Sequence, residues 1–274
     1  MVARHAPDAK TPRAARAYRL VRLIAHLIYG CTIAAVVFPF VSNRTELRII
    51  RYWSRGLLGI LNVRLHVHGR MPGGHAPTLV VTNHVSWLDI WVIHSVSPVR
   101  FIAKSDIRGW PLLGWLVARA GTIFIQRTRR HDTARINQTI HEVLAREERI
   151  GLFPEGTTTD GTHVLPFHAS LFQPALAGGA RIVAAGIRYP GRDGRPNVDA
   201  AYFGERSLLE SLRLILAQPQ LRAELVFAGV VEPAGRTRRD LAVESRALIA
   251  RALSLSPAVG SPPGTAAGRR AAAQ

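Results

Sequence analysis

The stretch that decides the fold is residues 78–93, which read TLVVTNHVSWLDIWVI. The first four residues are mostly apolar and are typical of a buried β-strand, whereas residues 90–93 continue without Gly or Pro, as a buried helix does. His84 therefore lies where a strand passes into a helix. Ser86 suits the start of that helix, because its hydroxyl can accept a free backbone N–H. Open α/β sheets bind ligands at the carboxyl ends of their strands, so this turn is the first candidate for a functional site.

The spacing between His84 and Asp89 restricts how the two side chains can meet. Five residues of regular helix rotate a side chain by about 500°, which leaves the two about 140° apart. They can meet only if His84 precedes the helix and Asp89 lies in its first turns. A carboxylate that holds one imidazole nitrogen fixes the tautomer and leaves the other nitrogen free to act as a base. The alternative interpretation is a capping Ser, a buried His and a surface Asp that share this region by chance.

Two further motifs follow in the chain, GTIFIQR at residues 121–127 and FPEGTT at residues 153–158. With Asn83-His84-x4-Asp89, and in this order, they resemble three signature blocks of the glycerolipid acyltransferase family. That family includes the bacterial 1-acyl-glycerol-3-phosphate acyltransferases and the lyso-ornithine lipid acyltransferases. The resemblance covers about residues 50–230 and implies an acyltransferase domain preceded by a membrane-embedded two-helix arm.

The resemblance assigns roles to individual residues. It implies that His84 is the catalytic base, that Asp89 orients it, and that Arg127 binds a phosphate. A planar guanidinium suits that task because it donates paired, charged hydrogen bonds. The alternative interpretation of Arg127 is a member of a solvated basic cluster with Arg129 and Arg130.

The FPEGTT motif supplies the remaining candidate substrate-binding residues, Glu155, Gly156, Thr157 and Thr158. Gly156 lets the backbone approach a ligand closely. Two roles for Glu155 stay open, positioning an acceptor hydroxyl or anchoring the loop beside His84. Many family members that take lysophosphatidate have Arg where this chain has Thr158. That difference weakens the assignment of a phosphate headgroup and keeps a lyso-ornithine-type acceptor as an alternative.

The composition indicates one membrane-associated domain with anionic partners. The chain has 274 residues, enough for a single sizeable core. Its 36 Lys and Arg against 18 Asp and Glu give a formal net charge of +18, which favours anionic lipid, nucleic acid or an acidic protein as partner. The single cysteine, Cys31, excludes an intrachain disulfide and a cysteine-based zinc site, and it lies in an apolar run where packing is its expected role.

The N-terminal region divides into a basic arm and two helices. Residues 1–19 are polar and basic, and we expect a disordered arm. Residues 23–41 lack Asp, Glu, Lys and Arg and would form a helix of about 28 Å, with Pro39 ending or bending it. Residues 47–61 form an amphipathic pattern with Arg on the solvated face and Trp53 at the lipid interface.

Basic residues flank residues 23–41 on both sides, so their distribution gives no orientation. We expect residues 20–61 to form two membrane-associated helices in one leaflet, with both ends cytoplasmic. A single transmembrane span and a pair of ordinary core helices are the alternatives.

The rest of the chain predicts one α/β domain over residues 62–253, with a central, mostly parallel sheet flanked by helices. Strands are expected at residues 63–68, 78–81, 99–103, 121–126, 150–153, 181–189, 200–203 and 223–228. Helices are expected at residues 110–120, 132–148, 208–216 and 239–253. Residues 254–274 are rich in Pro, Gly and Ala and are expected to be a disordered tail.

These features predict a membrane-bound O-acyltransferase at the cytoplasmic face of a bacterial inner membrane. The resemblance implies acyl-CoA or acyl carrier protein as the donor and 1-acyl-glycerol-3-phosphate as the first acceptor candidate, which would yield phosphatidate. Lyso-ornithine lipid is the alternative acceptor. No cofactor or metal is expected, because the thioester is already activated and the His and carboxylate residues lack zinc spacing. No Gly-x-Ser-x-Gly or Walker motif is present.

A rival from another class is a non-enzymatic basic protein that binds membrane or nucleic acid. It would account for the charge and for the amphipathic helices. It would not account for three motifs whose reactive residues fall at the ends of predicted strands, so no nucleic-acid partner is expected.

Overall fold

The computed structural model describes residues 10–74, 76–104, 109, 113–125, 138, 140, 142–144 and 148–257. Several sequence predictions fall wholly or partly outside these residues: the first nine residues of the basic arm, the start of the helix at 110–120, Arg127, most of the helix at 132–148, and the tail beyond residue 257.

A seven-stranded sheet forms the centre of the domain, in the order β1-β8-β7-β2-β5-β3-β4. Among the strand pairs that the described residues form in this sheet, only that of β7 and β8 is antiparallel, so the prediction of a mostly parallel sheet is confirmed. Every residue of β2 is buried, because helices cover both faces of a central parallel strand. The strands are β1 Val63–His68, β2 Thr78–Thr82, β3 Arg100–Lys104, β4 Ile123–Ile125, β5 Arg149–Leu152, β7 Arg181–Arg188 and β8 Leu221–Val231.

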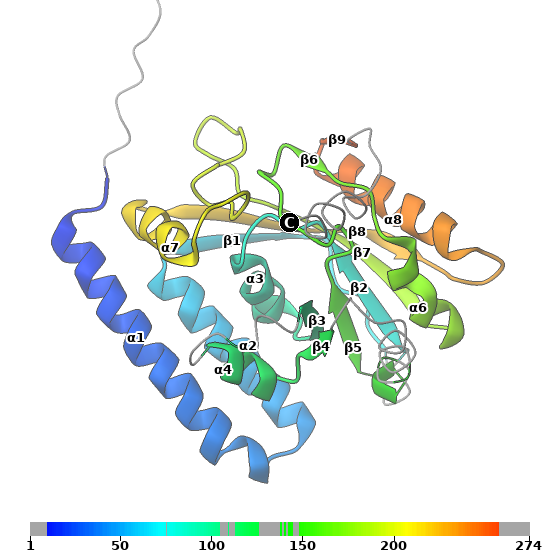
Figure 1. Ribbon diagram of the computed structural model, residues 1–274, viewed down its shortest axis with the longest axis horizontal. Coiled ribbons are helices and arrows are strands. Elements are labelled where there is room, and N and C mark those ends of the chain that lie inside the picture. The colour runs from blue at the N-terminus through cyan, green and yellow to red at the C-terminus, as the bar shows by residue number, and fades with distance from the viewer. Residues whose placement is uncertain are drawn as a thin grey trace, which may run out of the picture.

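Helices pack on both faces of the sheet and enclose two hydrophobic cores (Figure 1). Alternate residues of β2 serve the two cores, Val80 one of them and Leu79 and Val81 the other. One face carries α1 Arg13–Val36, α2 Asn43–Ile60, α3 Leu88–Val96, α4 Leu113–Arg119 and α7 Leu208–Ala217. The other face carries α6 Gln173–Ala177 and α8 Arg238–Ala252, with the short 3-10 helix η3 Ala169–Phe172.

The strand predicted at residues 200–203 is wrong. The segment forms consecutive turns, in which the Ala200 N–H donates to Asn197 O and the Ala201 N–H to Val198 O. The Tyr202 N–H then donates to the carbonyl of Val85 at 2.8 Å. The segment is apolar because it packs against the turn that holds His84. A buried loop and a short strand have similar composition, so the sequence pattern did not distinguish them.

The boundaries of the two segments that were expected to be disordered also need correction. Helix α1 begins at Arg13, inside the arm predicted at residues 1–19, and the Arg19 guanidinium donates to the carbonyls of Gln218 and Pro219. These hydrogen bonds to the residues after α7 hold the polar first turns of α1 in place, although those turns have no apolar pattern of their own. At the other end, β9 Ser256–Pro257 pairs with β6 His163–Val164, so the first residues of the predicted tail are structured.

Helix α2 belongs to the core of the domain, and the expected lipid-facing position of Trp53 is wrong. Trp53 is 8% exposed and stacks on the His26 ring of α1 with centroids 4.6 Å apart. On the predicted solvated face, Arg51 and Arg55 donate to the carbonyl of Ser95 near the end of α3. The apolar stripe of an amphipathic helix suits a protein core and a lipid surface equally well, so its pattern did not distinguish them.

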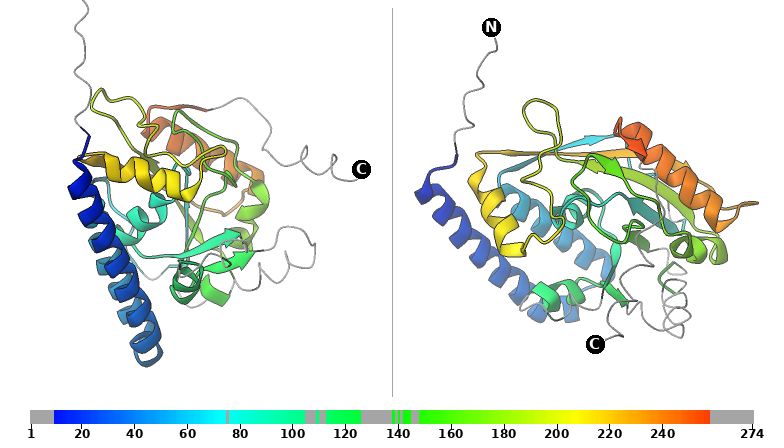
Figure 2. Two further views of the ribbon diagram at one scale, coloured as in Figure 1. Left: turned by 60° about the vertical axis from the view of Figure 1, so that its left-hand side comes forward. Right: turned by 45° about the horizontal axis from the view of Figure 1, so that its top comes forward.

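Helix α1 has the surface expected of a membrane-associated helix. It ends before the 3-10 helix η1 Phe38–Phe40, which contains Pro39, as predicted. Residues 13–40 are long and apolar enough to cross a membrane by length and composition. Figure 2 shows α1 along the margin of the molecule, and large apolar side chains on it are exposed, including Tyr18, Val21, Ile24, Ile28, Tyr29 and Val36.

Candidate active site

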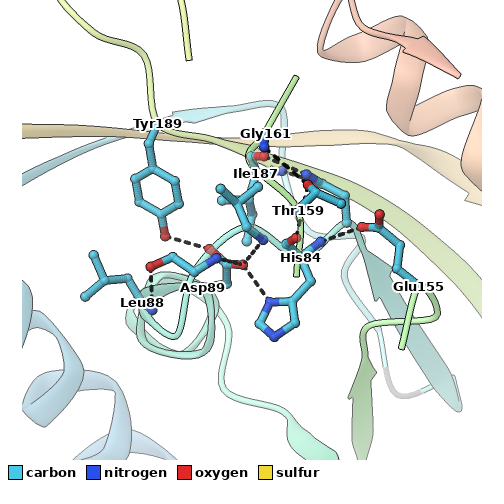
Figure 3. Close-up of polar contacts among 11 residues, drawn as sticks. His84, Leu88, Asp89, Glu155, Thr159, Gly161, Ile187 and Tyr189 are labelled. Atoms are coloured by element: carbon cyan, nitrogen blue, oxygen red, sulfur yellow. Dashed lines mark hydrogen bonds and ion pairs between the residues drawn. The ribbon is translucent and has the colours of Figure 1, made fainter. Parts of the chain in front are cut away.

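His84 and Asp89 meet across the turn between β2 and α3. Helix α3 begins at Leu88, so His84 precedes the helix and Asp89 lies in its first turn. The His84 Nδ1 atom is 2.8 Å from the Asp89 Oδ2 atom (Figure 3). Asp89 is fully buried, which contradicts the alternative of a chance surface Asp. The contact that the five-residue spacing predicted is therefore present.

The Asp89 carboxylate accepts four hydrogen bonds. Its Oδ2 atom accepts from His84 Nδ1 and from the backbone N–H groups of Val85 and Ser86 at 2.7 and 2.9 Å. Its Oδ1 atom accepts from the Tyr189 hydroxyl at 2.7 Å. Because the carboxylate only accepts, the His84 proton lies on Nδ1, and no described residue occupies the lone pair of Nε2. The side chain of His84 is 19% exposed, so a substrate can approach it.

Two stacked aromatic rings support one face of the imidazole. The His84 ring stacks on Phe153, at the end of β5, with centroids 3.9 Å apart and an interplanar angle of 12°. Phe153 stacks in turn on Phe101 of β3, with centroids 5.3 Å apart. The stack restricts rotation of the imidazole, so Nε2 points away from Asp89 in a defined direction.

Glu155 holds the backbone of His84. It is fully buried, its Oε1 atom accepts the His84 backbone N–H at 2.7 Å, and its Oε2 atom accepts the Leu165 N–H at 2.8 Å. Burial raises the pKa of this carboxyl to about 8, although both backbone N–H groups oppose the shift. Of the two roles left open by the sequence, the structure supports the anchor. Both carboxyl oxygens of Glu155 are thus engaged by backbone N–H groups, while its predicted contact with a substrate stays a prediction.

The remaining FPEGTT residues form a loop beside the imidazole. Gly156 has a positive φ of 75°, which glycine adopts without strain. The Thr159 N–H donates to the His84 carbonyl at 2.9 Å and attaches the loop to the turn. Thr157 is exposed and Thr158 is half-buried, so both are available to a ligand.

Sequence reasoning missed two residues that build this site. The Asn83 side-chain amide exchanges two hydrogen bonds with the backbone of Ile187, at 2.9 and 2.8 Å, and so ties the turn to β7. Its place in the first motif was the available signal. Tyr189 lies 100 residues from Asp89 and no local pattern pointed to their contact.

Comparisons with known proteins agree with this geometry. The sequence model of the Acyltransferase family matches residues 64–188. The chain is 34% identical over 245 residues to the lyso-ornithine lipid O-acyltransferase of Pseudomonas aeruginosa, and the alignment covers 86% of this chain and 92% of that protein. It is 38% identical over 196 residues to the 1-acyl-sn-glycerol-3-phosphate acyltransferase of Neisseria meningitidis, covering 72% of this chain and 75% of that protein.

The fold also matches a solved structure. The crystal structure of the 1-acyl-sn-glycerophosphate acyltransferase from Thermotoga maritima superposes with a TM-score of 0.60 and covers 86% of this chain and 96% of that chain. Its sequence identity is 20%, so this likeness concerns the fold alone. The sequence relatives favour an enzyme over the non-enzymatic binding protein considered above. The chain belongs to the acyltransferase family, and it is an O-acyltransferase.

Proposed function

We propose that His84 acts as the general base in acyl transfer from a thioester to a lysolipid hydroxyl. The observation that carries this proposal is the 2.8 Å contact between His84 Nδ1 and the buried Asp89 carboxylate, which leaves Nε2 free. Nε2 takes the hydroxyl proton as the oxygen forms a bond to the thioester carbonyl carbon. The carbon–sulfur bond then breaks and the leaving thiolate takes the proton back from the imidazolium. Asp89 orients the imidazole and stabilises its protonated form.

The proposed reaction needs no protein nucleophile, cofactor or metal, because the thioester is already activated. Gly156, Thr157 and Thr158, next to the attached loop, are proposed to contact the acceptor, together with Arg127. The attachment of this loop to His84 through the Thr159 N–H supports the proposal, as do the exposure of Thr157 and the partial exposure of Thr158.

Lyso-ornithine lipid is the acceptor that the observations favour. The alignment to the Pseudomonas relative named for that activity covers 92% of that protein. The family resemblance adds that many members that take lysophosphatidate have Arg where this chain has Thr158. The second candidate is 1-acyl-glycerol-3-phosphate, which is supported by the 38% identity to the Neisseria enzyme. An acyl-CoA or an acyl carrier protein is the proposed donor, since both are acidic and the chain carries a net charge of +18.

The attachment of α1 to the domain supports binding to one leaflet of a membrane, and we propose the cytoplasmic face of a bacterial inner membrane as its location. His26 of α1 and Trp53 of α2 exchange hydrogen bonds with each other's carbonyls, at 2.9 and 3.1 Å. Arg19 fastens the start of α1 to the end of α7. A perpendicular span would carry the neighbouring surface of α2, with its exposed Arg48 and Arg55, into hydrocarbon at a high cost. A helix lying in one leaflet buries its exposed apolar side chains without that cost.

One assay tests the function. The purified protein is given acyl-CoA or acyl carrier protein with lyso-ornithine lipid, 1-acyl-glycerol-3-phosphate and other lysophospholipids, alongside a His84→Ala variant. We expect acyl transfer to at least one lysolipid, with loss of about 10³-fold or more in His84→Ala while binding to anionic vesicles stays intact. Substantial transfer by His84→Ala would contradict the assignment of the base. Absence of transfer to every lysolipid would contradict the substrate class.

A further inference from the structure

Tyr189 is placed to influence the Asp89 carboxylate from the side opposite His84. It follows β7 directly, is 2% exposed, and donates its hydroxyl proton to Asp89 Oδ1 at 2.7 Å. Figure 3 shows the Asp89 carboxylate between the Tyr189 hydroxyl and the His84 ring. Tyr189 also lies one residue beyond the stretch that the Acyltransferase family model matches.

Of the four donors to Asp89 described above, Tyr189 and His84 are side chains and the other two are backbone N–H groups. The N–H groups of Val85 and Ser86 belong to the turn and survive any ordinary substitution. Replacing Tyr189 by Phe deletes one hydroxyl and keeps the ring that packs in the core. The hydroxyl withdraws negative charge from the carboxylate, so its removal concentrates that charge on Oδ2, next to His84 Nδ1.

The surroundings keep Tyr189 in place as a donor. Burial and the neighbouring Asp89 carboxylate raise the pKa of Tyr189 well above its ordinary value of 10, so the hydroxyl remains protonated wherever the enzyme works. The Asn197 N–H donates to the Tyr189 carbonyl at 2.8 Å, and Pro190 pairs with Pro196 to close the loop that follows. The hydroxyl therefore has little freedom to leave Asp89.

We propose that Tyr189 is a positioning residue that holds the Asp89 carboxylate and sets the basicity of His84 through it. The inference rests on the proposed role of His84 as the base. With the hydroxyl present, Asp89 keeps one orientation and attracts the imidazole proton moderately. Without it, the carboxylate rotates more freely and stabilises the imidazolium more strongly.

The titratable groups that face this network come from three elements besides the turn. They are Tyr189 after β7, Glu155 after β5, and Arg246 of α8, which lies on the Glu155 side and also donates to the carbonyl of Val164. Glu155 titrates near pH 8 and would contribute its own step to an activity profile. The measurement is therefore made both in the natural background and in Glu155→Gln.

The test is the pH dependence of acyl transfer by Tyr189→Phe. We expect kcat at the plateau to fall about tenfold, with KM for donor and acceptor unchanged within about twofold. The acid limb of the profile should move up by about half a pH unit or more, because the imidazolium is better stabilised. A fluorotyrosine incorporated at position 189 keeps the ring and strengthens the donor, so it should move the acid limb down.

Ser211→Ala is the matched control. It removes the buried acceptor of the Trp87 indole N–H, a hydrogen bond of 3.1 Å at the start of α3 that does not touch Asp89. It should lower the melting temperature without moving the acid limb. Opposite shifts in the Phe and fluorotyrosine variants support the proposal. An unmoved acid limb in fluorotyrosine, or in a folded Tyr189→Phe, would overturn it. Full activity in His84→Ala would instead overturn the proposed function, so the two failures are distinguishable.

Discussion

Asp89 and Glu155 are both fully buried carboxyl groups that contact His84, yet they contact different parts of it. Asp89 accepts from the ring nitrogen Nδ1, and Glu155 accepts from the backbone N–H. Asp89 receives four hydrogen bonds and Glu155 two, one on each oxygen. Burial raises the pKa of Glu155 to about 8 despite its two donors.

The difference separates chemistry from geometry in this site. A carboxylate at the ring alters the proton affinity of the proposed base, His84, whereas a carboxyl at the backbone fixes the position of that residue. Replacing Asp89 should therefore affect the reaction far more than replacing Glu155, and Glu155 should have its clearest effect on folding stability. Four predictions test this contrast, from the largest expected effect to the smallest.

Asp89→Asn should lower kcat by about 10³- to 10⁴-fold, because an amide can donate to Nδ1 and so favour the wrong imidazole tautomer. The steady-state rate with the preferred lysolipid measures this, and circular dichroism checks that the fold is kept. A loss below about tenfold in a folded variant would remove the distinction between the two carboxyl groups.

Glu155→Gln should lower kcat by about tenfold. The amide keeps one acceptor for the N–H groups of His84 and Leu165, so the turn shifts while the contact between His84 and Asp89 survives. The comparison is made with the Asp89→Asn rate under the same conditions. Equal losses in the two variants would mean that Glu155 takes part in the chemistry itself.

The folding stability should fall as the pH rises from about 5 to 8. The pKa of Glu155 is about 8 in the folded protein and 4.5 in a free side chain, so the folded state holds a proton that the unfolded state has released. That stabilisation is complete below pH 4.5 and is lost as the pH rises through 8. It amounts to a few kcal/mol at most, because a tenfold difference in proton affinity corresponds to about 1.4 kcal/mol.

Denaturant unfolding at several pH values measures this loss in the natural protein and in Glu155→Gln. The variant lacks the titrating group, so the difference in unfolding free energy between the two proteins should shrink toward pH 8. A difference that stays constant with pH would show that Glu155 ionises in the folded protein as it does in solution.

Phe153→Leu should have the smallest effect on activity, a loss of about threefold to tenfold in kcat. It removes the ring stacked 3.9 Å from His84 but leaves both carboxyl contacts in place. Steady-state kinetics that determine kcat, together with KM for both substrates, measure this loss. A loss as large as that of Asp89→Asn would indicate that ring support matters as much as the charge beside it.

Local pattern was sufficient where the interacting groups are close in the chain. The contact between His84 and Asp89 joins residues five apart in one strand–turn–helix unit, so backbone geometry alone allowed it to be foreseen. The buried strands β2, β5 and β7 were also expected, because continuous apolar runs are typical of a parallel sheet covered on both faces.

Local pattern failed where a group's role depends on what packs against it. The amphipathic stripe of α2 would fit a lipid surface as well as a protein core. The packing of α2 against α1 and α3 is what buries Trp53. The apolar residues 200–203 would suit a strand, and only their hydrogen bond to Val85 shows them to be a covering loop. The sequence left two roles open for Glu155, binding an acceptor hydroxyl or anchoring the loop. The anchor became the favoured role only when the structure showed that both carboxyl oxygens accept backbone N–H groups.

By itself the amino-acid sequence determined the α/β class and the pairing of an imidazole with a carboxylate, since both follow from periodicity and short spacings. It also indicated the family, through the resemblance of three short motifs to known signature blocks. The tertiary structure alone decided that Tyr189 completes the surroundings of Asp89. Strand β7 pairs in parallel with β2, with Ala185 opposite Thr82, so both strands end at the same edge of the sheet. Residues 100 positions apart are thereby brought within 2.7 Å, a proximity set by strand pairing and invisible to any local pattern.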